Sequence, residues 1–156
     1  MYLRTGGGHL APARSVAKYL TEKHGDSIAP VLIDGLAEAQ PIVRFIIEDG
    51  YRIVQAKAKW YYEFLYATNK FPPIGFMNVI VANASVKPYI RKMIAHHRPS
   101  SIVVFHFFLI MPVYQVLKEL GLDIPVTTVV TDPFTAHPLW FQRPAQQYVV
   151  FSERLR

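Results

Sequence analysis

Short apolar runs that alternate with helical segments constrain the fold of this chain more than any other feature of its sequence. The runs are SIAPVLIDG at 27–35, SIVVF at 101–105, PVTTVVTD at 125–132 and QYVVFSE at 147–153. Strands that are apolar along most of their length are typical of parallel sheets covered on both faces. Joined by right-handed crossovers, they predict an α/β fold with a doubly wound, Rossmann-like parallel sheet.

In the segments between these runs, apolar residues recur at the spacing of a helix. The expected helices cover residues 10–25, 41–70, 78–96 and 112–120. In the second of them Arg44, Glu48 and Arg52 follow one another at four-residue spacing, so they are expected to share one exposed face. The consecutive prolines of KFPPIG at 70–75 are expected to end this helix, and Pro88 is expected to kink or break the next one.

Size, charge and the absence of cysteine narrow the function classes. With 156 residues the chain is long enough for one domain, and without cysteine it has neither disulfides nor thiolate metal ligands. Its net charge of +6 favours anionic partners such as phosphorylated ligands or an acidic membrane surface. Nucleic acid is not expected, because the strands are apolar throughout and offer no exposed aromatic face with a basic groove.

A glycine-rich turn, TGGGH at 5–9, follows a stub of strand and leads directly into the first helix. The residues of interest are Gly6, Gly7, Gly8 and His9. Backbone N–H groups at a helix start favour an anion, and glycines let a ligand approach the backbone closely. The turn lacks the spacing of a dinucleotide-binding or Walker loop. A tight turn with nothing bound is the alternative.

Other polar side chains follow the remaining strands, namely Asp34, His106, Asp132 and His137. Because the carboxyl ends of parallel strands share one edge of a sheet, a ligand site is expected there. His9 is a candidate general base, or else a helix-start residue bonded to a neighbouring carbonyl. His106 is a ligand contact or a core histidine, and Asp132 is a strand-end carboxylate or a turn residue.

Two further features concern lipid or sugar binding. His137 and Trp140 in TAHPLWF either line a sugar or lipid site or pack the turn. Trp60 begins the cluster WYYEFLY at 60–66, whose consecutive aromatic residues cannot all be buried on one face of a helix and lie near lysines. This pattern suits either a membrane interface or core packing. The spacing of the histidines predicts no metal site.

In combination these motifs resemble the amino-terminal domain of the monogalactosyldiacylglycerol synthase and processive diacylglycerol glucosyltransferase family. These are GT-B glycosyltransferases, distantly similar to the peptidoglycan lipid-intermediate transferase. The resemblance spans nearly the whole chain and is carried by TGGGHLAPARSVAKYL at 5–20, VLID at 31–34, the aromatic segment at 51–66, His106 and VVTDPFTAHPLWFQRPAQQYVVFSE at 129–153. The last segment is the most specific of them.

The resemblance implies that residues 1–156 are the acceptor domain of a two-domain enzyme that transfers a hexose from a UDP-sugar to diacylglycerol. It places His9 and Asp132 in the cleft between the two domains. His9 is the preferred candidate for the general base, and Asp132 is the second candidate. Gly6, Gly7, Gly8, His106, His137, Trp140 and Trp60 become candidate acceptor or lipid contacts. No cofactor is expected. The enzyme would be cytoplasmic and peripheral on the inner face of an anionic membrane.

The sequence departs from the family pattern at three points. MYLR replaces a full first strand, the chain stops at Arg156 without the UDP-sugar domain, and His106 is followed by phenylalanine in place of the usual proline. The chain alone is therefore expected to be inactive. Two alternatives stay open: a non-catalytic module that binds anionic lipid, and a nucleotide-binding Rossmann half with Asp34 on a ribose. The choice between galactose and glucose belongs to the absent domain.

Overall fold

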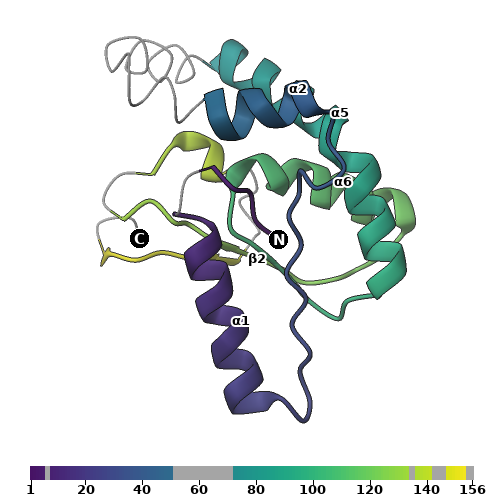
Figure 1. Ribbon diagram of the computed structural model, residues 1–156, viewed down its shortest axis with the longest axis vertical. Helices are drawn as coiled ribbons and strands as arrows, with labels where there is room; N and C mark the ends of the chain where they lie inside the picture. Colours follow the sequence, from purple (N-terminus) through teal and green to yellow (C-terminus); the bar gives the residue numbers. More distant parts are fainter. Residues whose placement is uncertain (6–7, 51–71, 134–135, 142–146, 154–156) are drawn as a thin grey trace.

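The computed structural model describes residues 1–5, 8–50, 72–133, 136–141 and 147–153 (Figure 1). The α-helices are α1 (Leu10–His24), α2 (Pro41–Arg44), α5 (Pro72–His97) and α6 (Ile110–Leu120). Shorter turns are the π-helix η1 (Phe45–Gly50) and the 3-10 helices η2 (Phe107–Leu109) and η3 (Pro138–Phe141). The strands are β1 (Ile102–Val104), β2 (Val126–Val129) and β3 (Gln147–Val149). The chain is thus the α/β fold that the alternating runs predict.

The start of the chain lies inside the sheet. β1 pairs in parallel with β2, and β2 pairs in parallel with β3. On the other side of β1, the N–H of Phe105 donates to the carbonyl of Met1 at 2.9 Å. Tyr2 in turn forms a parallel bridge with Asp34. The spatial order is therefore 33–35, 1–3, β1, β2, β3, with the N-terminus near the centre of the molecule (Figure 1).

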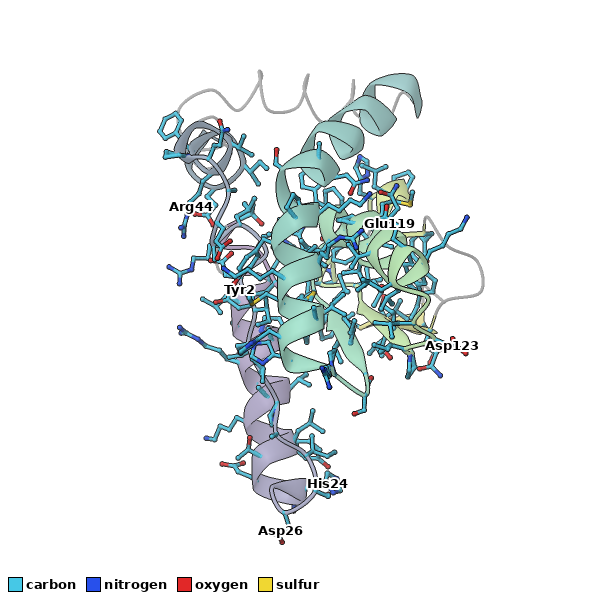
Figure 2. The ribbon with its side chains drawn as sticks, turned by 90° about the vertical axis from the view of Figure 1, so that its right-hand side faces the viewer. Tyr2, His24, Asp26, Arg44, Glu119 and Asp123 are labelled. Atoms are coloured by element: carbon cyan, nitrogen blue, oxygen red, sulfur yellow. The ribbon has the colours of Figure 1, made fainter. Side chains whose placement is uncertain are left out.

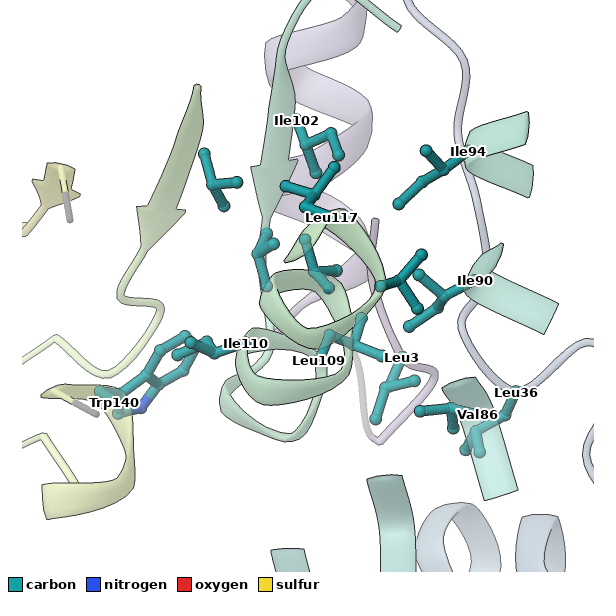
Figure 3. Close-up of a cluster of buried hydrophobic side chains, with 14 of the residues drawn as sticks. Leu3, Leu36, Val86, Ile90, Ile94, Ile102, Leu109, Ile110, Leu117 and Trp140 are labelled. Carbon is teal, nitrogen blue, oxygen red and sulfur yellow. The ribbon is translucent and has the colours of Figure 1, made fainter. Parts of the chain in front are cut away.

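Two apolar clusters cover the two faces of this sheet, because successive side chains of a strand point to opposite faces. Leu3 lies in the larger cluster, with α5 and α6, whereas its neighbour Tyr2 lies in the smaller one, with Ala13 of α1. Figure 3 shows the larger cluster, in which Ile90 and Ile94 of α5 lie on one side of α6 and Ile110 lies beside Trp140 on the other. Figure 1 shows α1 and α6 on opposite sides of the sheet. The doubly wound arrangement is therefore confirmed.

The helix boundaries are partly as expected. The first helix is confirmed as α1, and α6 ends at Gly121, whose left-handed backbone (φ 63°) forms the C-cap. The prolines at 72 and 73 form the first turn of α5. Proline is tolerated there because the N–H groups of a first helical turn have no partner within the helix. Pro88 lies inside α5 without breaking it. Among the described residues, no helix is both long and apolar enough to cross a membrane.

Two predictions of buried strands are wrong in part. In 27–35 only the end pairs with the sheet, and Ile28, Val31 and Leu32 are exposed. The neighbouring segment, residues 1–3, bonds the backbone of Ile33 and Gly35, and no described strand pairs with residues 28–32. In the last run, Val149 and Phe151 are exposed, because β3 pairs only with β2 among the described strands and no described helix covers that part of its face.

Ion pairs tie α5 to its neighbours across the surface. Lys87 and Arg91 of α5 both contact the carboxylate of Glu119 on α6, and Lys92 pairs with Glu38 at 2.5 Å. Figure 2 shows Glu119 beside α5. The predicted pair of Arg44 and Glu48 is present at 2.9 Å, while Arg52 lies outside the described residues. These exposed pairs link α5 to α6 and to the loop that precedes α2, and each is expected to contribute little to stability.

Replacing Gly35 with alanine is expected to destabilise the chain by about 1–3 kcal/mol, the range for overpacking a core. A Cβ at Gly35 would lie 2.5 Å from Cδ2 of Leu109 and 3.1 Å from Cδ2 of Leu3. Both leucines are fully buried, so neither has free space into which to move. Urea unfolding of the variant measures the loss. Gly8→Ala is the control, since its added Cβ meets nothing within 4 Å; equal midpoints for the two variants would contradict this prediction.

Candidate active site at the carboxyl edge of the sheet

His9 is the N-cap residue of α1, yet its side chain makes no hydrogen bond to that helix. The ring is used elsewhere: Nδ1 lies 2.7 Å from Oγ1 of Thr131, which follows β2. The ring also hydrogen-bonds the backbone of Phe105 at the end of β1. His9 therefore joins the start of α1 to the ends of two strands. Its contact with the backbone of Phe105 agrees with the alternative of a helix-start residue bonded to a neighbouring carbonyl, and its role as a general base stays a prediction.

His106 comes directly after β1 and lies against His9, with ring centroids 4.4 Å apart. It caps η2, because the N–H of Phe108 donates to its Nδ1 at 3.2 Å. A ring nitrogen that accepts cannot carry the proton, so His106 is assigned the Nε2–H tautomer. Its side chain is buried. The two histidines meet because the strands that precede them, 1–3 and β1, are neighbours in the sheet.

Burial decides the charge of both rings. Desolvation lowers the pKa of His106 well below its usual value, and the proximity of His9 lowers it further. Desolvation also lowers the pKa of His9, partly opposed by the hydrogen bond to Phe105 and by the negative charge of Asp132. Both imidazoles are therefore neutral at neutral pH, which is the protonation state that a general base requires.

Asp132 organises the segment that follows β2. Its Oδ2 accepts a hydrogen bond from Nε1 of Trp140 at 2.9 Å and another from the backbone N–H of His137 at 3.3 Å. Trp140 is fully buried and meets the ring of Phe107 edge-on at 5.6 Å. The carboxylate thus satisfies the indole N–H of a buried anchor, as a polar group removed from water requires.

His137 completes this cluster. Its ring stacks on that of Phe107 at 5.7 Å, and its Nδ1 accepts from the N–H of Leu139 at 3.2 Å. Trp140 in turn lies 6.2 Å from the ring of His9 and 6.4 Å from that of His106. The rings of three separate segments, namely His9, His106 with Phe107, and His137 with Trp140, therefore form one continuous cluster.

The structure brings most of the predicted site residues together. His9, His106, Asp132, His137 and Trp140 lie in this one cluster at the carboxyl edge. Within it, His106, His137 and Trp140 are buried, whereas His9 and Asp132 are partly exposed. Of the predicted site residues in the cluster, these two are the ones with solvent-exposed surface. Gly8 is exposed, and Gly6, Gly7 and Trp60 lie outside the described residues.

Thr131 and Phe107 belong to the cluster but were not predicted as site residues. Thr131 ends an apolar run, so its hydroxyl gives no separate signal in the sequence. The position directly after a predicted strand and before Asp132 is the one clue that was available. Phe107 sits beside His106 in a phenylalanine-rich stretch, where one aromatic residue cannot be told from its neighbours by pattern.

Asp34, the residue expected on a ribose under the nucleotide-binding alternative, is engaged elsewhere. Its carboxylate accepts from the N–H of Leu36 at 3.1 Å and forms ion pairs with Arg4 at 3.1 Å and Arg44 at 3.6 Å. It is also buried. Because its oxygens already have protein partners, the geometry disfavours that alternative. In the described part of the chain, no cluster of three or more His, Asp or Glu side chains could hold a metal ion.

The family model for monogalactosyldiacylglycerol (MGDG) synthase matches residues 9–156. The chain belongs to the MGDG synthase family. The match starts at His9, so residues 1–3 and the glycines at 6–8 lie outside it. All rings of the aromatic cluster lie within the part of the chain that matches the family model.

Curated relatives agree with this assignment. A probable chloroplastic MGDG synthase of Nicotiana tabacum is 26% identical over 141 residues, which cover 89% of this chain and 26% of that protein. A processive diacylglycerol beta-glucosyltransferase of Bacillus mycoides (strain KBAB4) is 24% identical over 152 residues, covering 97% of this chain and 37% of that protein. The chain thus spans about a quarter to a third of the length of these relatives. No solved structure matches the chain.

Proposed function

We propose that this chain is the acceptor domain of a lipid glycosyltransferase that transfers a hexose from a UDP-sugar to diacylglycerol. The observation that carries the proposal is a neutral, partly exposed His9 at the carboxyl edge of the sheet in a member of the MGDG synthase family. The names of the relatives supply the acceptor class, a diacylglycerol. The UDP-sugar would bind to a second domain, as the greater length of the relatives suggests.

In the proposed reaction His9 takes the proton of the acceptor hydroxyl while that oxygen attacks the anomeric carbon of the hexose. The bond between this carbon and the UDP oxygen breaks, UDP leaves with the bonding electrons, and the configuration inverts. Asp132 assists because its negative charge raises the pKa of His9 and so favours the imidazolium that forms. The start of α1 offers backbone N–H groups to negative charge that develops nearby.

The proposal includes docking on an anionic membrane surface at the cytoplasmic face, where the acceptor lipid resides. It is supported by the net charge of +6 and by exposed basic residues on α1, among them Arg14, Lys18 and Lys23. Trp60 and the neighbouring tyrosines, which lie outside the described residues, would reach the lipid interface. A purely lipid-binding module without catalysis would share these features, so turnover has to be tested separately from binding.

The test pairs vesicle binding with hexose transfer. The chain alone is expected to float with vesicles that contain diacylglycerol and phosphatidylglycerol, and to transfer no hexose from UDP-galactose or UDP-glucose. The full-length protein that contains this chain is expected to bind the same vesicles and to form glycosyldiacylglycerol. Transfer by the chain alone would contradict the two-domain proposal. Binding without transfer by the full-length protein would favour the lipid-binding module.

A further inference from the structure

The two oxygens of the Asp132 carboxylate have different surroundings. Both hydrogen bonds to this side chain are made at Oδ2, one from Nε1 of Trp140 at 2.9 Å and one from the backbone N–H of His137 at 3.3 Å. Among the described residues Oδ1 has no hydrogen-bond partner, and it is not one of the side-chain atoms enclosed by the protein. The carboxylate thus has one oxygen that the protein uses and one that solvent reaches.

The bonded oxygen fixes the position of the other one. Trp140 is fully buried, His137 is buried as well, and η3 begins directly after His137, so both N–H groups belong to a packed segment. A carboxylate that is bonded at one oxygen by two such groups has little freedom to turn. Oδ1 therefore keeps one direction at the edge of the sheet, and an oxygen that is already held loses little entropy when a ligand binds.

The place of Oδ1 and its chemistry limit what it can bind. An ionised carboxylate only accepts hydrogen bonds, so its partner has to be a donor such as a hydroxyl group. Asp132 follows Thr131, whose Oγ1 lies 2.7 Å from Nδ1 of His9, and the ring of Trp140, which holds Asp132, lies 6.2 Å from the His9 ring. In the proposed reaction two molecules meet beside His9, namely the acceptor lipid and the hexose.

The hydroxyl groups of these two molecules decide between them. Diacylglycerol has a single free hydroxyl, and its proton is the one that His9 takes in the proposed reaction. That proton is therefore not available for a hydrogen bond to Asp132. The hexose of a UDP-sugar carries several free hydroxyls, and they lie on the same ring as the anomeric carbon that the acceptor oxygen attacks.

We propose that Asp132 is a specificity-determining residue that binds one hydroxyl of the transferred hexose through Oδ1, while Trp140 and the backbone of His137 hold its Oδ2. The inference rests on the proposed function, since the hexose is the substrate named there. It gives the acceptor domain a part in sugar recognition, which the family resemblance assigns to the second domain. A site that hydrogen-bonds a substrate hydroxyl strongly rejects the analogue that lacks it, because its own polar group is then left without a partner.

The experiment measures transfer to diacylglycerol by the full-length protein, from the intact UDP-hexose and from analogues that each lack one hydroxyl of the hexose. Asp132→Ala removes both carboxylate oxygens. Asp132→Asn keeps a carbonyl oxygen for Trp140 and His137 and replaces the other oxygen with NH₂, so the hydrogen bond to the hexose is no longer charge-assisted. Urea unfolding shows whether each variant folds, and Asp132→Asn carries the comparison if Asp132→Ala does not.

Asp123→Asn is the matched control. Asp123 is exposed and precedes β2, so it lies at the other end of the strand that Asp132 follows (Figure 2). The substitution makes the same chemical change away from the candidate site. Its kcat/KM for the intact UDP-hexose and for each analogue should equal that of the wild type.

The wild type is expected to transfer one of the analogues with a kcat/KM lowered about 10- to 100-fold relative to the intact UDP-hexose, the usual range for losing a hydrogen bond to a charged group. In Asp132→Ala this penalty should disappear, for that analogue alone. In Asp132→Asn it should be smaller than in the wild type. A merely structural defect would lower the rates for all UDP-hexoses by the same factor and leave every penalty unchanged, and that result would overturn the inference.

Two further outcomes count against the inference. A loss confined to transfer onto glycosyldiacylglycerol, with diacylglycerol unaffected, would show that Asp132 binds a sugar of the acceptor. If the wild type transfers no hexose from any UDP-sugar, the proposed function is wrong and the inference falls with it. Transfer by the wild type with penalties that Asp132→Ala leaves unchanged refutes the inference alone.

Discussion

Replacing His9 with glutamine in the full-length protein is expected to lower hexose transfer by about 10²- to 10⁴-fold, the usual contribution of a general base. Glutamine retains a polar side chain that can bond Thr131 and the Phe105 carbonyl, but it cannot accept a proton at neutral pH. The loss should therefore appear in kcat, with vesicle binding and the unfolding midpoint close to those of the wild type. Transfer is measured as glycosyldiacylglycerol formed from a UDP-sugar on lipid vesicles.

The pH profile of the unmodified protein provides an independent check on His9. Burial lowers its pKa from the ordinary imidazole value, so the ring loses its proton at a lower pH than a free histidine does. As a base it is active when deprotonated. The value of kcat/KM should therefore rise with pH through a limb below about pH 6.5 and then level off.

His24→Gln is the matched control for His9→Gln. It removes an exposed histidine from the last turn of the same helix, α1, and is expected to leave both the rate and the pH limb unchanged. If His9→Gln keeps more than a tenth of the wild-type rate, His9 is not the base. Asp132, the other partly exposed acid–base group of the cluster, then becomes the residue to test.

Replacing Trp140 with alanine is expected to destabilise the chain by about 3–5 kcal/mol, the range for removing a large aromatic side chain from a core. Trp140 is fully buried, and its Nε1 donates to Oδ2 of Asp132 at 2.9 Å. The substitution leaves a cavity beside Ile110, its neighbour in the core (Figure 3). It also removes the hydrogen bond that the indole N–H donates to the carboxylate of Asp132. Urea unfolding with and without the substitution gives the difference in unfolding free energy.

One variant separates the packing of Trp140 from its hydrogen bond, and a second serves as a surface control. Trp140→Phe retains most of the apolar volume and should recover a large part of the lost stability. Phe141→Ala truncates the exposed neighbour and should change the unfolding free energy little, since surface substitutions rarely have large effects. A Trp140→Ala chain with wild-type stability but weaker vesicle binding would instead make this residue a lipid contact.

The meeting of His9 and His106 could be predicted from the sequence because of one geometric rule. Carboxyl ends of parallel strands share an edge, so residues that follow neighbouring strands are brought together. The extent of each strand could not be predicted in the same way. Val31 and Val149 are apolar, but whether they are buried depends on pairing partners and covering helices that no local pattern encodes.

Site chemistry was predictable in kind but not in arrangement. His9 and Asp132 stand out because each is an ionisable residue near the carboxyl end of a predicted strand, where ligands of such sheets bind, and both are in the cluster. Thr131 does not stand out, because its importance lies in a contact to a residue 122 positions away. Trp140 was compatible with either ligand binding or packing, and only its contact with Asp132 reveals how the tertiary structure uses its N–H group.

The segment Met1–Leu3 precedes the other segments of the sheet in the sequence, yet it lies between two of them in the sheet. One neighbour, Ile33, follows soon afterwards, but the contact between Met1 and Val103 joins residues 102 positions apart. Contacts between such distant residues close large loops and slow folding. Until the region around Phe105 emerges from the ribosome, this strand keeps an unpaired edge. The same pairing brings His106 against His9, so the contact of His9 with the other rings depends on residues that are far apart in the sequence.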